Sequence, residues 1–223
     1  MTNVGVIVFP GTNCEMDAVS AVETAGGVAE FIWHGEKNLG DVDAVIVPGG
    51  FAHGDYLRSG AIARFSPVME AVVRFAAEGG PVLGICNGFQ VLAEAGLVPG
   101  ALQKNAGLKF VCKPVKLMVE STSNVVSTQY ELGQELTIPI NHFEGNYTVD
   151  SKTLHELEDN KQVFLRYVDN PNGSVASIAG VSNRAGNVVG LMPHPERASN
   201  TLLGSADGLP MFVSLLTNSF VAS

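Results

Sequence analysis

The sequence predicts an α/β fold: a single doubly wound, mostly parallel sheet with helices on both faces and antiparallel additions. In the first half, short apolar runs alternate with stretches whose apolar residues have helical spacing, which is typical of βαβ units. After about residue 108, apolar runs follow one another with short connections, which indicates antiparallel strands. The 223 residues are 46% hydrophobic, enough for one sizeable core, and we expect one domain over residues 1–223.

The expected elements of the first half alternate in type. Residues 4–9 form an almost unbroken apolar run, as in a strand that is covered on both faces. Residues 28–33, 44–47 and 82–85 are expected to be further strands. Three helices are predicted by apolar residues at helical spacing. The first passes through Ala18, Val19, Val22 and Ala25, a longer one through Ile62, Phe65, Met69, Val72, Val73 and Ala76, and the third through Phe89, Val91, Leu92, Ala93 and Ala95.

The second half predicts mainly strands. Residues 111–119, 137–140 and 163–168 are expected to be strands, and residues 174–182 and 188–192 are expected to form a β-hairpin. A closing helix is predicted over residues 209–220. No helix or strand is assigned from the sequence to residues 121–135 and 150–162.

Charge and cysteine content exclude several classes of function. The net charge of −9 gives no electrostatic reason to bind nucleic acid or an anionic membrane. No apolar run approaches transmembrane length, and no basic segment precedes an apolar one at the N-terminus, so we expect neither a membrane anchor nor a signal peptide. Cys14, Cys86 and Cys112 are an odd number and too widely spaced for a disulfide framework or a zinc site. We therefore expect a cytoplasmic protein without a bound metal.

Cys86 stands at the predicted turn from a strand into a helix. Gly84 and Gly88 flank it in the Gly-x-Nuc-x-Gly spacing of a nucleophile elbow, with cysteine in place of serine. Glycines permit the close backbone approach of such a turn, and the helix N-terminus behind it favours the thiolate over the thiol. A lone cysteine is more often a buried core residue. Here the two glycines and the change of hydrophobic period favour a nucleophile.

Other polar or glycine-rich groups follow predicted strand ends, where open α/β sheets bind ligands. His194 and Glu196 lie two residues apart between prolines that favour extended backbone, so the carboxylate can orient the imidazole. An imidazole so oriented can take the proton of the nucleophile and later give it to a leaving amine. One of Gly49 and Gly50, together with Asn87 at the elbow, is expected to offer backbone N–H groups as an oxyanion hole.

These residues carry a resemblance to a known family. The segment GICNGFQ over residues 84–90, with His194 and Glu196, resembles the class I (triad-type) glutamine amidotransferases. Three further segments are similar to the glutaminase subunits of phosphoribosylformylglycinamidine synthases: PGTNCE over residues 10–15, PGGFAHGDYLRSGAIA over residues 48–63, and MPHPER over residues 192–197. The resemblance spans essentially the whole chain and implies a flavodoxin-like fold.

The resemblance also implies residue roles. Cys86 is expected to be the nucleophile, His194 the base and acid, Glu196 its orienter, Gly50 and Asn87 the oxyanion donors, and Gly49 and Gln90 contacts to glutamine. The loop of residues 141–147 is placed at the glutamine pocket, with Phe143 where the family commonly has glycine. His142 and His53 are expected to be polar loop residues, and Cys14 and Cys112 to be unreactive.

The implied activity is release of ammonia from L-glutamine through a γ-glutamyl thioester on Cys86. A separate synthetase subunit would use ATP and Mg to convert formylglycinamide ribonucleotide to formylglycinamidine ribonucleotide in de novo purine biosynthesis. This chain has no Gly-x-x-x-x-Gly-Lys-[Ser/Thr] loop, so we expect no cofactor in it and assign the ATP chemistry to the partner. The resemblance also implies an additional small subunit in the complex.

Two other functions stay open. A stand-alone γ-glutamyl or peptide hydrolase would share the elbow and need no synthetase, and activity of the purified chain on glutamine against γ-glutamyl peptides separates the two. A non-catalytic binding module would keep only the fold. Failure of Cys86 to react with a glutamine-analogue electrophile would indicate that module.

Overall fold

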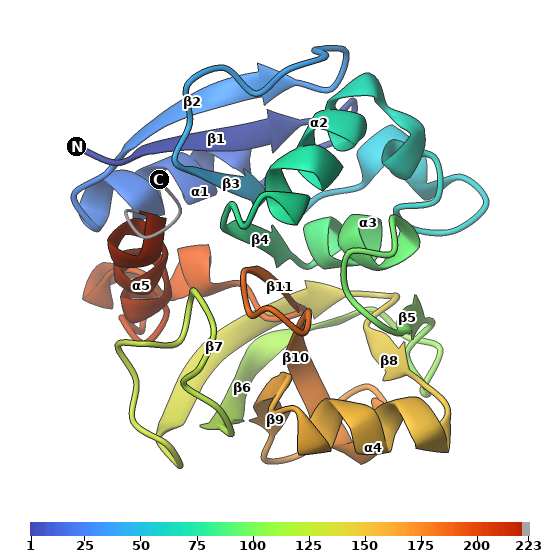
Figure 1. The fold of residues 1–223 in the computed structure, drawn as a ribbon. Helices are drawn as coiled ribbons and strands as arrows, with labels where there is room; N and C mark the ends of the chain where they lie inside the picture. Colours follow the sequence, from blue (N-terminus) through green and yellow to red (C-terminus); the bar gives the residue numbers. More distant parts are fainter. Residues whose placement is uncertain (220–223) are drawn as a thin grey trace.

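The computed structural model describes residues 1–219 and has the predicted α/β architecture (Figure 1). The strands are β1 Asn3–Val8, β2 Val28–Trp33, β3 Ala44–Val47, β4 Val82–Ile85, β5 Ala101–Gln103, β6 Val111–Val119, β7 Glu135–His142, β8 Asn146–Thr148, β9 Val163–Tyr167, β10 Ile178–Ser182 and β11 Val188–Leu191. The helices are α1 Glu15–Thr24, α2 Pro67–Ala77, α3 Asn87–Glu94, α4 Ser151–Asp159 and α5 Leu209–Asn218. Short 3-10 turns cover Ala52–Asp55, Ala63–Phe65, Val175–Ser177, Pro195–Ala198 and Thr201–Leu203.

The main sheet of the described residues has nine strands in the order β2-β1-β3-β4-β11-β10-β9-β6-β7. The pairs among β2, β1, β3, β4 and β11 are parallel. The strands β10, β9, β6 and β7 continue the sheet in antiparallel pairs. Because β11 pairs with both β4 and β10, the predicted hairpin joins the parallel half of the sheet to the antiparallel half.

The central strands are covered on both faces, as their apolar runs predict. Every residue of β3, β4 and β11 is buried. Helix α1 packs against β1, β2 and α5, and α3 packs against β3, β4 and β11. Figure 1 shows α1 and α5 together on the left of the view and α2 and α3 on the right. The carboxyl ends of β3, β4 and β11 therefore lie side by side between helices.

The prediction of a long helix through residues 62–76 is wrong for the first turn of that helix. Ser66 is extended and Pro67 begins α2, because the proline ring fixes φ and suits the first helical position. Residues Ala63–Phe65 form a separate 3-10 turn. As a result Phe65 is 73% exposed instead of lying on the core face. Val73 belongs to α2 itself and is also exposed, so its predicted place on the core face is wrong as well.

In the second half, the predicted strands and the hairpin are present, and β7 extends further at both ends than expected. The first hairpin strand, expected over residues 174–182, begins only at Ile178, because residues Val175–Ser177 form a 3-10 turn. Helix α4 and the small antiparallel pair of β5 and β8 have no counterpart among the sequence predictions. The predicted closing helix is present as α5, and residue 220 lies outside the described residues. No helix in residues 1–219 is long and apolar enough to cross a membrane.

Candidate active site

Cys86 lies at the sharp turn between β4 and α3, with φ of 50° and ψ of −104°. A positive φ is uncommon for a residue with a side chain and is typical of a strained functional turn. Gly84 and Gly88, on either side of Cys86, must be glycines because there is no room for a side chain at either position. An added Cβ at Gly88 would lie 1.7 Å from the carbonyl oxygen of Val47, and one at Gly84 would lie 2.5 Å from Leu92 Cδ1. The turn thus has the geometry of a nucleophile elbow.

We expect Gly88→Ala to lower the free energy of unfolding by about 3 kcal/mol, because the backbone of β3 would have to move away from the new methyl group. Gly107→Ala is the matched control, since no atom lies within 4 Å of its ideal Cβ position. Its effect should be below about 1 kcal/mol. Urea unfolding of both variants measures the difference. Similar losses in the two variants would show that β3 and α3 separate freely.

His194 and Glu196 form a buried pair just beyond β11. The Nδ1–H of His194 donates to Oε1 of Glu196 at 2.5 Å, and the two residues are 1% and 2% exposed. The expected extended backbone is wrong, because residues Pro195–Ala198 form a 3-10 turn. The side chains meet across this turn instead. The N–H of His194 also donates to the carbonyl of Pro139 on β7, which fixes the segment against the sheet.

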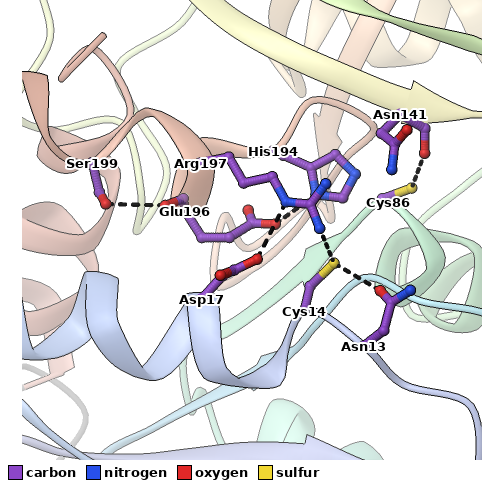
Figure 2. Close-up of polar contacts among 9 residues, drawn as sticks. All are labelled: Asn13, Cys14, Asp17, Cys86, Asn141, His194, Glu196, Arg197 and Ser199. Carbon is purple, nitrogen blue, oxygen red and sulfur yellow. Dashed lines mark hydrogen bonds and ion pairs between the residues drawn. The ribbon is translucent and has the colours of Figure 1, made fainter. Parts of the chain in front are cut away.

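The His194 imidazole lies between Glu196 and Cys86 in Figure 2. Burial acts to lower the pKa of His194, but the Glu196 carboxylate and then the Cys86 sulfur raise that pKa well above the ordinary value. The proton on Nδ1 is committed to Glu196, so Nε2 is the nitrogen free for proton transfer; it has no hydrogen-bond partner within residues 1–219. A positively charged imidazole beside a cysteine stabilises the thiolate nucleophile.

One expected oxyanion donor, Gly50, lies in the cavity wall, and the other, Asn87, directly follows Cys86 at the elbow but is not among the lining residues. The backbone N–H of Asn87 belongs to the first turn of α3, which leaves it without a partner inside the helix. Gly50 lines the cavity with φ of 151°, and an added Cβ would lie 2.7 Å from Thr12 Cα. The Asn87 side chain links the elbow to the following loop, because its Oδ1 accepts from Ala52 N at 3.0 Å. The elbow and the loop after Gly50 are therefore coupled through the Asn87 side chain.

A cavity of about 200 Å³ opens beside the elbow, and its lining includes Cys86, His194 and Gln90. Nε2 of Gln90 donates to the carbonyl of Glu144, so the expected glutamine contact is itself held in place. Gly49 is not among the lining residues. An added Cβ there would lie 2.9 Å from His194 Cε1, which places Gly49 against the imidazole.

No individual role is predicted from the sequence for two acidic groups of the cavity, although the resemblance places the loop that contains Glu144 at the glutamine pocket. Asp55 and Glu144 line the cavity from loops far apart in the chain. Ser59 donates its hydroxyl to Glu144 Oε2 at 2.8 Å. Burial raises the pKa of Asp55 to about 6; a Ser59 hydrogen bond opposes the rise and the Glu144 charge adds to it. Within the cavity, these two carboxyl groups can attract the ammonium group of an amino acid.

Cys14, which is expected to be unreactive, also lies in the cavity wall. Figure 2 shows it beside Arg197, whose Nη2 donates to the Cys14 sulfur at 3.2 Å. Potential ligand atoms of Cys14, His194 and Glu196 lie within 4.8 Å of one another. The Arg197 guanidinium opposes a cation at this position. The absence of a metal from the chemistry, and the expected inertness of Cys14, stay predictions.

The interpretation of His142 as a polar loop residue is wrong. It is the last residue of β7, is 3% exposed and belongs to the cavity lining. Its position on the inward face follows Ile138 and Ile140 at the strand period of two, a pattern that the sequence contains. His53 does lie in a loop, within the 3-10 turn Ala52–Asp55.

A cysteine at a strained strand-to-helix turn, beside an imidazole oriented by a carboxylate, suits acyl transfer from an amide, as in the triad class of amidotransferases. Comparison with known proteins agrees: residues 1–207 match the family of CobB/CobQ-like glutamine amidotransferase domains. The chain belongs to this family.

Two solved structures illustrate the relationship. A chain in the structure of PurLQS from Thermotoga maritima is 42% identical and has a TM-score of 0.90, over 97% of this chain and 98% of that chain. A putative GMP synthase subunit from Thermoplasma acidophilum is 15% identical and has a TM-score of 0.67, over 99% of this chain and 95% of that chain. The second likeness shows the shared fold alone.

Proposed function

We infer that this chain is the glutaminase subunit of phosphoribosylformylglycinamidine synthase. It releases ammonia from glutamine for a separate ATP-dependent synthetase, which converts formylglycinamide ribonucleotide to formylglycinamidine ribonucleotide. The observation that carries this conclusion is the 42% identity to a chain of PurLQS, which extends over nearly the full length of both chains. The family match and the geometry around Cys86 support the same activity.

The geometry supports a sequence of steps for the chain's own residues. The Cys86 thiolate attacks the γ-carbonyl carbon of glutamine, and the oxyanion that forms is stabilised by the N–H groups of Gly50 and Asn87. Nε2–H of His194 donates its proton to the amide nitrogen as the C–N bond breaks, which releases ammonia and leaves a γ-glutamyl thioester. His194 then takes a proton from water, and the resulting hydroxide displaces Cys86 and forms glutamate. Glu196 holds the imidazole throughout.

Several parts of the assignment rest on the resemblance. ATP and Mg belong to the synthetase subunit, and a small additional subunit completes the complex. A cytoplasmic location is supported by three unpaired cysteines, Cys14, Cys86 and Cys112, which a reducing compartment would keep in that state.

The loop of residues 51–60 supports control of this activity by the partner. His53, Asp55 and Leu57 have positive φ values of 53°, 53° and 71°, so the loop is strained. Leu57 is 91% exposed and Tyr56 is 73% exposed, which leaves an apolar surface for docking. Asn87 contacts this loop through Asp55 Oδ1 at 3.3 Å. A docked synthetase can therefore order the loop and, through Asn87, the oxyanion hole.

We expect low glutaminase activity for the isolated chain and a rise of at least about tenfold, or ~1.4 kcal/mol of barrier, with the synthetase and its substrates present. Glutamine hydrolysis should be measured with and without the partner, at fixed enzyme and saturating glutamine. Formation of formylglycinamidine ribonucleotide from glutamine tests the assignment itself. Equal hydrolysis in the two conditions would contradict the coupling and favour a stand-alone hydrolase.

A further inference from the structure

His142 has a side chain whose hydrogen-bonding capacity is only half used. Its Nδ1 lies 3.0 Å from Asn105 Oδ1. Its Nε2 is buried and has no hydrogen-bond partner within residues 1–219. A buried polar atom without a partner costs about 1–3 kcal/mol, so such an atom in an active-site wall calls for a functional explanation.

The surrounding contacts fix the tautomer of His142. The Asn105 amide nitrogen donates to two carbonyl oxygens, those of Lys109 at 2.9 Å and His142 at 3.0 Å. Its Oδ1 accepts from the N–H of Gly145 at 3.1 Å. An amide so oriented presents only an acceptor to the imidazole, and therefore the proton of His142 lies on Nδ1. Nε2 is left as a bare acceptor.

The imidazole also stays neutral under ordinary conditions. Burial, and then the nearby charge of His194, lowers the pKa of His142 to about 4. Gly145 packs directly over the ring, since an added Cβ would lie 2.2 Å from its Cε1. Neutral, held through Nδ1 and covered by a glycine, the ring is a fixed hydrogen-bond acceptor at neutral pH.

His142 lies at the end of β7, close to the atoms that react. The preceding residue, Asn141, has its carbonyl oxygen 3.8 Å from the Cys86 sulfur, so β7 ends beside the nucleophile. The oxyanion must face Gly50 and Asn87, whereas the leaving nitrogen must face His194, which protonates it. His142 and His194 both line the cavity, and His142 is close enough for the His194 charge to act on it, which supports a place for both imidazoles on this second side.

We propose that Nε2 of His142 accepts a hydrogen bond from the γ-amide NH₂ of glutamine and keeps that bond as the nitrogen departs as ammonia. The contact holds the amide plane so that the nitrogen lone pair can take the proton of His194 Nε2–H. No proton passes to His142. The proposal rests on the proposed glutaminase function and assigns a second, non-triad histidine to the leaving group.

Two matched substitutions test the acceptor in the assembled complex. His142→Gln places an amide oxygen near the Nε2 position, whereas His142→Asn reaches only the Nδ1 position. Asn105 Oδ1 keeps its bond from Gly145 in both variants. Each variant is assayed for kcat/KM on L-glutamine and on the γ-methyl ester of glutamate, whose leaving group has no N–H.

We expect His142→Asn to lower kcat/KM on glutamine by about tenfold, the equivalent of one hydrogen bond, with the ester value within about twofold of wild type. His142→Gln should retain most of both activities. Equal losses on both substrates in the Asn variant, no loss on either, or the same glutamine-selective loss in both variants would overturn the proposal. Failure of the wild-type complex to hydrolyse glutamine would instead refute the proposed function.

A second measurement needs no change at residue 142, and so survives a folding defect in either variant. In a Cys86→Ala complex, the ¹⁵N resonance of the unprotonated His142 Nε2 should move when L-glutamine binds and not when the γ-methyl ester binds. An unchanged resonance with saturating glutamine, or the same shift with both ligands, would overturn the proposal.

Discussion

Replacing Cys86 by alanine should lower glutamine-dependent synthesis by the assembled complex on the order of 10⁴-fold or more, while ammonia-dependent synthesis stays at the wild-type rate. Cys86 occupies the strained turn beside His194, and releasing ammonia requires its sulfur. The use of ammonia does not require the Cys86 sulfur, because that step belongs to the synthetase. The two rates are measured on one preparation with glutamine or an ammonium salt as the nitrogen donor.

Cys112→Ala is the matched control, since Cys112 is an exposed, unpaired cysteine on β6 outside the cavity lining. It should leave both rates unchanged. Cys14 cannot serve, because it lines the same cavity as Cys86. Glutamine-dependent turnover retained by Cys86→Ala would refute the nucleophile assignment. A parallel fall of the ammonia-dependent rate would show that the substitution disturbs folding or assembly.

The parts of this site that the sequence predicts are those encoded in short segments. The elbow depends on Gly84, Cys86 and Gly88, which lie within five consecutive residues, and its strand and helix differ in hydrophobic period. His194 and Glu196 are separated by one residue, so the pairing can be proposed from the sequence alone. The pair does form, although through a 3-10 turn and not through the expected extended conformation.

The parts that the sequence does not predict depend on long-range packing. Cys14 reaches the cavity because the loop after β1 pairs with the loop after β3, through the bridge between Thr12 and Gly50. The resemblance places residues 141–147 at the pocket, but the burial of His142 depends on β7, an edge strand of a sheet whose order no local pattern specifies. The Asn105 contact that fixes His142 spans 37 residues. The break before α2 is different, since Pro67 was a visible signal for a helix start.

The His194–Glu196 pair should respond unequally to substitution. His194→Ala removes the group that transfers the proton, and we expect thioester formation to fall about 10³–10⁴-fold. Glu196→Gln keeps an oxygen that can accept from Nδ1–H but removes the charge that raises the pKa of His194. Losing one charge-assisted hydrogen bond costs about 1.5–3 kcal/mol, so we expect the rate of thioester formation to fall by about tenfold to a hundredfold.

Single-turnover rates of thioester formation, measured side by side in the assembled complex, separate the role of His194 in proton transfer from that of Glu196 in orienting and charging the imidazole. His155→Ala on the exposed side of α4 is the control for loss of an imidazole and should have no effect. Because the Glu196 charge favours the protonated imidazole, its removal should also lower the pKa of His194 and reduce the fraction of the thiolate–imidazolium pair at a given pH.

Equal losses in His194→Ala and Glu196→Gln would mean that the carboxylate does more than orient and charge the imidazole. The amide introduced by Glu196→Gln could then have turned its NH₂ group toward Nδ1 and fixed the wrong tautomer, and a rate restored by Glu196→Asp would identify that cause.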